Sequence, residues 1–247
     1  MNLLAVLMVA STTAKPSLGD RLVANVLLQR RLPLTVSEAT NANWTAITGD
    51  PTACDAVSGR RFRLGEHLTP TLIFDNTNRL AGLQMVVNDT TDPPYPQSNV
   101  RSPPFFSASG DRPSTSTMAV HFKDPAKLCS AKAADHEAGS IGDRLWVRLG
   151  TASVTSAQAA DFEQIPLSLT ELQAGQADTG WTPGDCIASS SYYPGSAGMG
   201  THYWRYLSDT SQCKDIGPLF LMYDRGALSA FGFVCHWGIE PKRIHLC

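Results

Sequence analysis

Two stretches far apart in the chain follow the same pattern of strand, turn and strand. They run through residues 70–87 and residues 218–234. Each begins with a proline, continues as a short apolar run, turns at an aspartate and ends in a second apolar run. Short apolar runs separated by turn-forming residues are typical of β-hairpins. The sequence therefore predicts a mainly β chain in which these two hairpins set the architecture.

Helix signals are few and short. Residues 18–31 fit a short amphipathic helix and fit a strand as well, whereas residues 168–171 carry a capping-box pattern that starts one or two turns. The connectors are rich in Ser, Gly and Pro, as in residues 92–104, 107–116 and 189–200. The predicted fold is a disulfide-stabilised antiparallel sandwich or barrel with long loops and minor helix.

Six cysteines are spread widely over the chain: Cys54, Cys129, Cys186, Cys213, Cys235 and Cys247. None belongs to a Cys-x-x-Cys pair, so neither a zinc ribbon nor a thioredoxin-type site is expected. This even number of six predicts three structural disulfides, formed in an oxidising compartment. The pairing stays open, because six cysteines allow fifteen connectivities.

The first residues indicate export from the cell. Residues 3–10 form an apolar run followed by small residues, a pattern typical of a signal peptide, here cleaved after Ala14. The alternative is an N-terminal strand of the core. Cleavage would leave residues 15–247 as a single secreted, extracellular β-rich domain. No transmembrane segment is expected, because no apolar run approaches about 20 residues. Asn43 and Asn88 begin glycosylation sequons, which suits a secreted glycoprotein.

The charge balance argues against nucleic-acid binding. The formal net charge is −2 and the isoelectric point is near 6.3. A nucleic-acid-binding domain carries a basic patch or stripe, and the one basic cluster of this chain, at residues 60–63, is short. We expect this cluster at a solvated strand edge or turn.

A repeated motif suggests two related halves, at about residues 15–149 and 150–247. The pattern Met-x-x-His-aromatic occurs at residues 118–122 and again at residues 199–203. The hairpin precedes this motif in the first half and follows it in the second, so a simple tandem repeat does not fit. A permuted or pseudo-symmetric duplication and coincidence both stay open.

These methionines and histidines suggest an alternative function, that of a copper-binding protein or metalloenzyme. Imidazole and thioether groups both bind copper, and the candidate ligands are His121, His202, Met199 and His236. In a strand, residues three apart point to opposite faces, so Met199 and His202 converge only if the chain bends. The favoured interpretation is that the methionines fill the core and the histidines are half-buried polar residues, without a cofactor.

An enzyme is the less favoured class. The chain has no Gly-x-Ser-x-Gly nucleophile elbow, and its glutamates stand in no paired context that indicates a glycosidase. All of its cysteines can pair, which leaves none as a nucleophile. A hydrolase with an unrecognised site is the third alternative, and no catalytic residue is assigned.

Aromatic residues crowd one segment beside a Gly- and Ser-rich loop: Tyr192, Tyr193, Tyr203, Trp204 and Tyr206. Aromatic rings on loops contact glycans, lipids or protein partners in many secreted domains. Tyr203 and Trp204 are neighbours, so both cannot face the core from one strand. We therefore expect a ligand-binding surface for one of these three kinds of partner, formed by Tyr203, Trp204, Tyr192 and Tyr193. The alternative is that these rings alternate into a core.

Several strings in the second half carry a resemblance. Residues 199–203 (MGTHY), 218–223 (PLFLMY) and 228–232 (LSAFG) follow one another, and residues 122–129 hold an aromatic-x-Asp-Pro segment before a cysteine. Together they resemble a little-characterised family of secreted animal proteins with MGxHY and PxFLxY…LxAFG motifs. The resemblance implies that these motifs belong to one fold unit, and it transfers no functional residue. The sequence thus predicts a secreted, disulfide-bonded binding or structural protein.

Overall fold

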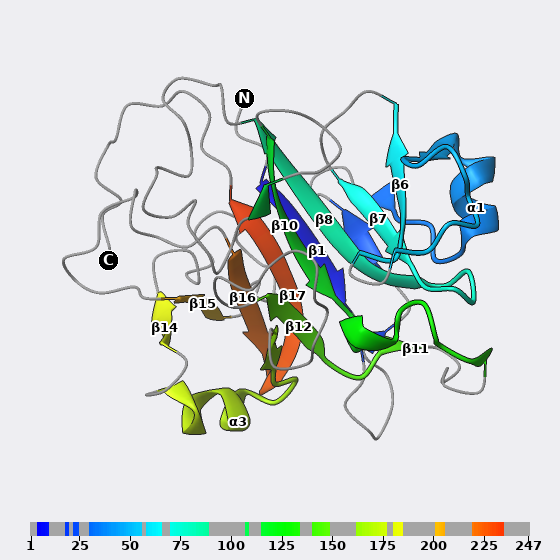
Figure 1. Cartoon of the computed structure of the whole chain (residues 1–247). Helices are drawn as coiled ribbons and strands as arrows, with labels where there is room; N and C mark the ends of the chain where they lie inside the picture. Colours follow the sequence, from blue (N-terminus) through cyan, green and yellow to red (C-terminus); the bar gives the residue numbers. More distant parts are fainter. Residues whose placement is uncertain are drawn as a thin grey trace.

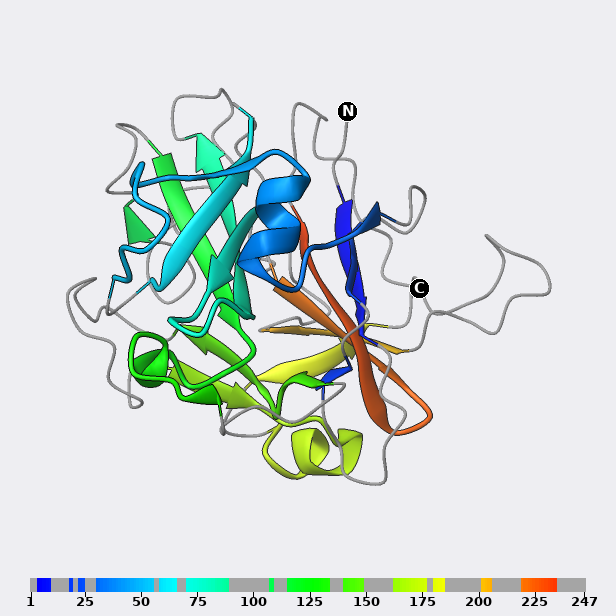
Figure 2. The ribbon, with the colours of Figure 1, turned by 90° about the vertical axis from the view of Figure 1, so that its right-hand side faces the viewer.

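The structure is a computed structural model of the chain. It describes residues 4–9, 18–19, 22–24, 30–55, 58–65, 70–88, 107–108, 115–133, 140–148, 162–176, 180–184, 201–205 and 219–234. Within these residues the chain forms two large antiparallel sheets that contribute to one core, with little helix (Figures 1 and 2). The predicted class, mainly β and antiparallel with minor helix, is confirmed.

The first sheet has eight strands. Seven of them run in the spatial order β13 (Phe162–Ile165), β12 (Leu145–Arg148), β10 (Thr115–His121), β8 (Leu80–Asn88), β7 (Thr71–Phe74), β6 (Arg60–Leu64) and β5 (Trp44–Ala46). The short strand β9 (Ser107–Ala108) pairs with β10 beside this row. The 3-10 helix η1 (Pro125–Lys127) follows β10 along the chain.

The second sheet has seven strands. Their order is β14 (Trp181–Gly184), β15 (Thr201–Arg205), β16 (Leu219–Asp224), β17 (Ala227–Val234), β1 (Leu4–Val9), β3 (Leu22–Ala24) and β4 (Arg30–Arg31). A two-stranded sheet joins β11 (Ser140–Gly142) to β2 (Leu18–Gly19). The helices of the described residues are α1 (Val36–Asn41), close to the first sheet, and α3 (Leu169–Ala174), which lies near the start of β17 in Figure 1.

The two sheets share one apolar core. Buried side chains of the first sheet, such as Leu83 and Val120, belong to the same cluster as Leu221 and Phe231 of the second. The rings of Phe122 and Phe231 lie 6.0 Å apart, so the end of β10 packs on β17. The two sheets therefore form one packed scaffold.

The two predicted hairpins are confirmed as β7–β8 and β16–β17. Their strand bounds lie within a residue or two of the predicted runs. Asn78 (φ 68°) and Gly226 (φ 82°) take the left-handed conformation in the turns. Glycine adopts that conformation without a steric penalty and asparagine tolerates it better than most residues, which explains the turn chemistry of both stretches.

Each hairpin turn is held in the same way by the segment that precedes a short helix. Two backbone hydrogen bonds do this in each sheet: Val36 N to Asn78 O (3.0 Å), Leu80 N to Leu34 O (2.8 Å), Leu169 N to Gly226 O (2.9 Å) and Leu228 N to Leu167 O (2.8 Å). The series α1–β5–β6–β7–β8 and α3–β14–β15–β16–β17 have the same order, and successive strands pair in both. The chain thus contains the same supersecondary unit twice.

The Met-x-x-His motif does not mark equivalent positions in these two units. Strand β10, which carries His121, pairs with the second strand of its hairpin, β8. Strand β15, which carries His202, pairs with the first strand of its hairpin, β16. In the first sheet β10 lies next to β8, the second strand of its hairpin. In the second sheet the strand next to β17 in the same place is β1.

The predicted signal peptide contains strand β1. This strand pairs with β17 on one side, over residues 4–8, and with β3 on the other. Cleavage after Ala14 would sever the strand from the rest of the chain. Cleavage stays a prediction, and the intact mass of the exported protein measures it.

The prediction for the basic cluster was wrong, and of the two alternatives left open for residues 18–31 the structure shows the strand. The basic cluster at residues 60–63 lies in β6, between β5 and β7, and not at an edge or turn. Arg60 is buried and its guanidinium donates hydrogen bonds to Asn78 Oδ1 and to the carbonyl oxygen of Pro51. The described parts of residues 18–31 are strands, since the chain there pairs with β1 and β11. No helix of the described residues is long and apolar enough to cross a membrane.

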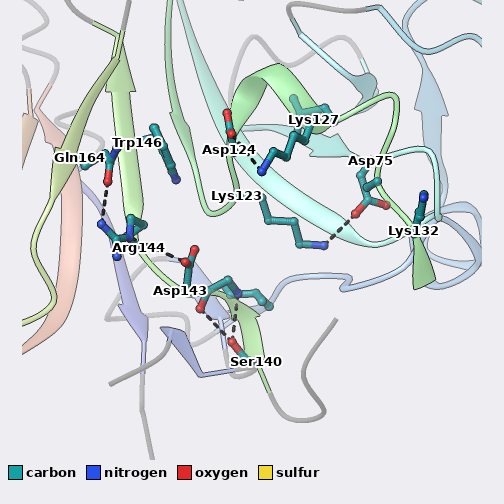
Figure 3. Close-up of a pocket in the computed structure, with 14 residues that line it drawn as sticks. Asp75, Lys123, Asp124, Lys127, Lys132, Ser140, Asp143, Arg144, Trp146 and Gln164 are labelled. Atoms are coloured by element: carbon teal, nitrogen blue, oxygen red, sulfur yellow. Dashed lines mark hydrogen bonds and ion pairs between the residues drawn. The ribbon is translucent and has the colours of Figure 1, made fainter. Parts of the chain in front are cut away.

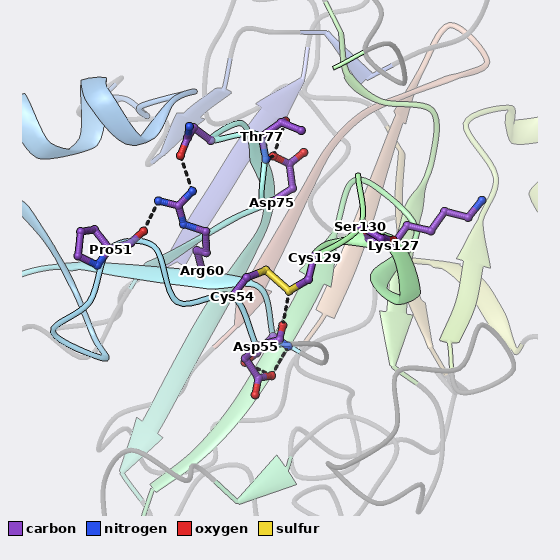
Figure 4. The surroundings of a disulfide bond; sticks show 11 residues. Pro51, Cys54, Asp55, Arg60, Asp75, Thr77, Lys127, Cys129 and Ser130 are labelled. Carbon is purple, nitrogen blue, oxygen red and sulfur yellow. Dashed lines mark hydrogen bonds between the residues drawn. A yellow bond between two sulfur atoms is a disulfide. The ribbon is translucent and has the colours of Figure 1, made fainter. Parts of the chain in front are cut away.

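One disulfide joins Cys54 to Cys129, across a sequence separation of 75 residues (Figure 4). It ties the loop between β5 and β6 to the segment that follows η1. The predicted disulfide bonding is therefore confirmed for this pair. The other four cysteines lie outside the described residues, so the remaining two bridges stay predictions.

Replacing both Cys54 and Cys129 with alanine is expected to lower the free energy of unfolding by about 2–4 kcal/mol. The bridge restricts a long loop of the unfolded chain, and that restriction is lost in the variant. Urea unfolding of the variant and the wild type measures the difference. An unchanged unfolding midpoint would contradict a stabilising role for this bridge.

Candidate functional site

The described histidines among the proposed copper ligands lie on different sheets. His121 is on β10 and His202 is on β15. Each ring packs on a phenylalanine ring, with centroids 5.5 Å apart for His121 and Phe162 and 5.3 Å apart for His202 and Phe220. Among the residues that the structure describes, no group of three or more His, Cys, Asp or Glu could hold a metal ion.

Strand geometry separates the methionine and the histidine of the first motif. Met118 belongs to the shared core. His121 lies three positions further along the strand and therefore on the opposite face. Met199 and His236 lie outside the described residues, so a copper site that includes them stays a prediction.

The predicted aromatic surface is divided between two faces of β15. Tyr203 is 3% exposed and belongs to the core, where its ring packs on Tyr223 at 5.5 Å. Trp204 is half-buried on the other face, with its ring 5.0 Å from that of Phe220. Tyr192 and Tyr193 lie outside the described residues.

A polar cleft of about 820 Å³ opens at the first sheet, and neither Tyr203 nor Trp204 is among its described lining residues (Figure 3). We call it the main cleft. It is lined by Asp75, Lys123, Asp124, Lys127, Leu128, Ala131, Lys132, Ser140, Ile141, Gly142, Asp143, Arg144, Trp146 and Gln164. The lining comes from the β7–β8 turn, η1 and its flanks, β11, the β11–β12 turn, β12 and β13.

The wall of the main cleft near β12 follows from strand register. Trp146 lies opposite His121 on β10 and opposite Gln164 on β13. Directly opposed residues share a face of a sheet, so the side chains of Trp146, His121 and Gln164 lie on the same face. The core side chain of Met118 lies on the other face. His121 is thus next to the wall of the main cleft without being among its lining residues.

Trp146 is the most informative residue of this wall. The residue is 7% exposed, and its Nε1 is a buried donor without a hydrogen-bond partner within the described structure. A buried N–H without an acceptor costs about 1–3 kcal/mol. Native proteins pair nearly all such groups with protein, water or ligand atoms. The indole N–H of Trp146 is therefore a candidate donor to a water or a ligand oxygen.

Asp75 anchors the opposite side of the main cleft, as Figure 3 shows. Its side chain is fully buried, and Oδ1 accepts hydrogen bonds from Thr77 N (2.9 Å), Thr77 Oγ1 (2.7 Å) and Arg79 N (3.0 Å). Lys123 Nζ donates to Oδ2 at 2.7 Å. Burial acts to raise the pKa of Asp75, but the hydrogen bonds from Lys123, Thr77 and Arg79 outweigh it and hold the pKa below its usual value.

Two more carboxylate–cation pairs line the main cleft. Lys127 Nζ lies 3.7 Å from Asp124 Oδ2, and Arg144 Nε lies 3.7 Å from Asp143 Oδ2. Arg144 also donates from Nη1 to Gln164 Oε1 at 2.6 Å. The described residues that line the main cleft include four cations and three carboxylates: Lys123, Lys127, Lys132 and Arg144, and Asp75, Asp124 and Asp143.

Local sequence explains how the loops around the main cleft are held. Asp124 Oδ1 accepts from Ala126 N at 3.0 Å, and the proline that follows the aspartate starts η1. Gly142 passes close to the end of β10, because a Cβ at that position would lie 1.7 Å from Phe122 O. Only glycine allows this approach, which brings β11 against the cleft.

A second hollow of about 390 Å³ adjoins the main cleft. It is lined by Asp143, Arg144, Gln164, Ile165, Pro166, Leu167, Ser168 and Glu171. Three of these residues, Asp143, Arg144 and Gln164, also line the main cleft. The two spaces thus meet at the hydrogen bond between Arg144 and Gln164.

A buried ion pair lies behind β13 and joins the two sheets. Glu163 of β13 accepts from Trp181 Nε1 at 2.8 Å and from Arg205 Nη1 at 2.5 Å, and both donors belong to the second sheet. Burial raises the pKa of Glu163, and the charge of Arg205 and the two hydrogen bonds only partly offset this effect. The pair holds β13 in place, and the residue that follows Glu163 on this strand, Gln164, lines the main cleft.

No residue of the main cleft is among the site residues that the sequence predicts. In the sequence, Asp75 is the first residue of a hairpin turn, and Asp124 belongs to an aromatic-x-Asp-Pro string. Neither signal indicates a ligand, because aspartate is common in turns for local reasons. Trp146 carries no sequence context that marks its N–H, since only tertiary packing leaves that donor without a partner.

The comparisons with known proteins return no relatives. No protein-family model, no curated protein and no solved structure matches the chain.

Proposed function

We propose that this chain is a secreted, disulfide-bonded binding protein that holds a saccharide in the main cleft. The observation that carries the proposal is the buried indole N–H of Trp146 at the wall of a polar space of about 820 Å³. Ligand pockets commonly have volumes of about 300–1,000 Å³. A sugar hydroxyl is an acceptor of the right size for this donor, and it donates in turn to neighbouring carboxylates.

The lining favours a saccharide over the other two partner classes. A lipid tail needs a continuous apolar surface. Of the fourteen described residues that line the main cleft, ten are charged or polar or, as for Trp146, carry a polar N–H. Protein interfaces of ordinary size are broad patches, whereas this space is a concave pocket. Rigid carboxylates, amides and cations around one aromatic ring suit the alternating hydroxyl and C–H surfaces of a sugar.

Export is part of the same proposal. The apolar leader, the disulfide between Cys54 and Cys129 and the sequon at Asn43 all agree with an oxidising compartment. Asn43 is exposed at the end of the turn after α1, where a glycan meets no buried surface. Membership of the little-characterised secreted family belongs to this proposal as well.

A glycan screen of protein exported from a eukaryotic host, followed by calorimetry on the best ligand, tests the proposal. Replacing Trp146 with phenylalanine keeps most of the ring and removes the N–H donor. We expect Kd to rise about tenfold, as for the loss of one hydrogen bond to a ligand in a desolvated site. The melting temperature of the variant shows whether the fold is kept.

The matched control is Trp204→Phe, which makes the same change on β15 at the predicted aromatic surface. We expect this variant to bind as the wild type does. If Trp204→Phe weakens binding and Trp146→Phe does not, the aromatic surface is the site and the main cleft is not. Absence of binding to every glycan would overturn the saccharide proposal.

A further inference from the structure

We infer that the ligand is an acidic oligosaccharide that crosses the Arg144–Gln164 hydrogen bond and occupies both hollows, with its acidic group at Arg144. This inference rests on the proposed function, because it specifies which saccharide the same site takes. It follows from the shape of the two spaces, the state of Arg144 and the distribution of charge.

The boundary between the hollows is built from side chains near the surface. Arg144 has an exposed fraction of 49% for its side chain, and Gln164 is exposed. Their hydrogen bond lies where the main cleft and the second hollow share lining residues. Exposed side chains change rotamer on the picosecond to nanosecond timescale. A chain-like ligand therefore lies across this boundary without a change in the backbone.

Arg144 has hydrogen-bonding capacity left for an anion. A guanidinium carries five N–H donors, and in the described structure one of its nitrogens, Nη1, donates to Gln164. The contact of its Nε with Asp143 is 3.7 Å long, between side chains with exposed fractions of 49% and 68%. Ion pairs of this kind contribute little. A carboxylate or sulfate that makes two charge-assisted hydrogen bonds with the guanidinium replaces this contact favourably.

The described residues of the two hollows differ at one charged position near their boundary. Asp143 and Arg144 line both hollows, whereas the carboxylate of Glu171 lines the second hollow. An acidic sugar unit bound at Arg144 is repelled by Glu171. The ligand thus places its acidic unit on the side of the main cleft and a neutral unit beside Glu171.

Alternating acidic and neutral sugars meet this requirement, so the probes are hyaluronan fragments of two, four and six units. Chitin fragments of the same lengths serve as neutral controls. We expect hyaluronan fragments to bind at least tenfold more tightly than chitin fragments of equal length. We also expect the preference to shrink as salt rises, because exposed charges are screened.

The variant Arg144→Gln tests the role of the guanidinium. We expect the ratio of chitin Kd to hyaluronan Kd to fall toward one, because the charge-assisted hydrogen bonds to the acidic unit are lost. The matched control is Arg225→Gln. Arg225 is also an exposed arginine that follows an aspartate, at 3.2 Å from Asp224, but it lies in the β16–β17 turn. We expect the control to keep the preference.

The outcomes separate this inference from the proposed function. Equal binding of neutral and acidic fragments that depends on Trp146 would overturn the inference and leave the proposed function standing. A preference for hyaluronan that Arg225→Gln abolishes and Arg144→Gln does not would also overturn it, since the charge would act elsewhere. Failure of every fragment and every screened glycan to bind overturns both.

Discussion

Asp75→Ala is expected to lower the free energy of unfolding by about 3–5 kcal/mol. The substitution removes the acceptor of three hydrogen bonds within the β7–β8 turn and leaves Lys123 Nζ, at 18% exposure, without its carboxylate. Removing one partner of a buried, hydrogen-bonded charge pair is among the most destabilising single changes. Urea unfolding followed by tryptophan fluorescence measures the loss.

The repeated unit supplies a matched control for this prediction. Asp224 begins the corresponding turn of β16–β17, but its side chain is 42% exposed and its ion partner, Arg225, is 86% exposed. Asp224→Ala is therefore expected to change the free energy of unfolding by no more than about 0.5 kcal/mol. If the two variants lose equal stability, Asp75 is not the anchor that its contacts indicate.

The lowered pKa of Asp75 predicts how the free energy of unfolding changes in acid. Its pKa is lower in the folded chain than the ordinary value of 3.8. Its contribution to stability is therefore fully present above about pH 4 and is lost as the pH falls through the folded pKa. Asp75→Ala removes this contribution, so its stability should fall less steeply with acid than that of the wild type.

Glu163→Ala is expected to destabilise the protein by a similar amount, about 3–5 kcal/mol. It leaves the guanidinium of Arg205, at 8% exposure, without its carboxylate, and it removes the acceptor of Trp181 Nε1. Because these contacts cross from the first sheet to the second, the loss weakens the packing between the sheets. Thermal unfolding followed by circular dichroism measures it.

The double variant Glu163→Leu/Arg205→Met shows whether Glu163→Ala is unstable because the ion pair is lost or because the charge of Arg205 is left unpaired. Replacing a whole buried ion pair with apolar residues of similar volume is often neutral or stabilising. We therefore expect the double variant to recover most of the stability that Glu163→Ala loses. A double variant as unstable as Glu163→Ala would show that the pair itself supplies the stability.

Glu163 has the opposite pH dependence to Asp75. Burial raises its pKa above the ordinary value of 4.5, so the folded chain binds the proton more tightly than the unfolded chain. Its contribution is greatest below that ordinary value and is lost as the pH rises through the folded pKa. Above pH 4.5 the free energy of unfolding of Glu163→Gln should therefore fall less steeply with rising pH than that of the wild type. Asp75→Ala should not change this pH dependence above pH 4.5.

The fold was predictable where local chemistry decides it. The two hairpins follow from apolar runs and turn residues, and α3 begins after Ser168, as its capping-box pattern indicates. Helix α1 was missed although Thr35 and Glu38 form the same pattern, and Glu38 N donates to Thr35 Oγ1 at 3.2 Å. The burial of Arg60 was not predictable, because its acceptors belong to a distant turn and a loop.

The candidate site could not be read from the sequence because it has no local motif. Its side chains come from segments between Asp75 and Gln164 that the sheet brings together. The sequence placed the candidate ligands on His202 and its aromatic neighbours, but Tyr203 lies in the core. His121 comes nearest, since register places it beside Trp146. A single sequence does not contain the register of three strands, and that register defines the wall of the main cleft.

The indole N–H signals of the five tryptophans test the central claim most directly. They are recorded on ¹⁵N-labelled protein titrated with the bound glycan, with Trp146→Phe to assign one of them. We predict that the Trp146 signal shifts with saturation, while that of Trp181, whose N–H already donates to Glu163, stays in place. A titration in which the Trp146 signal does not move although the glycan binds would contradict the main cleft as the site.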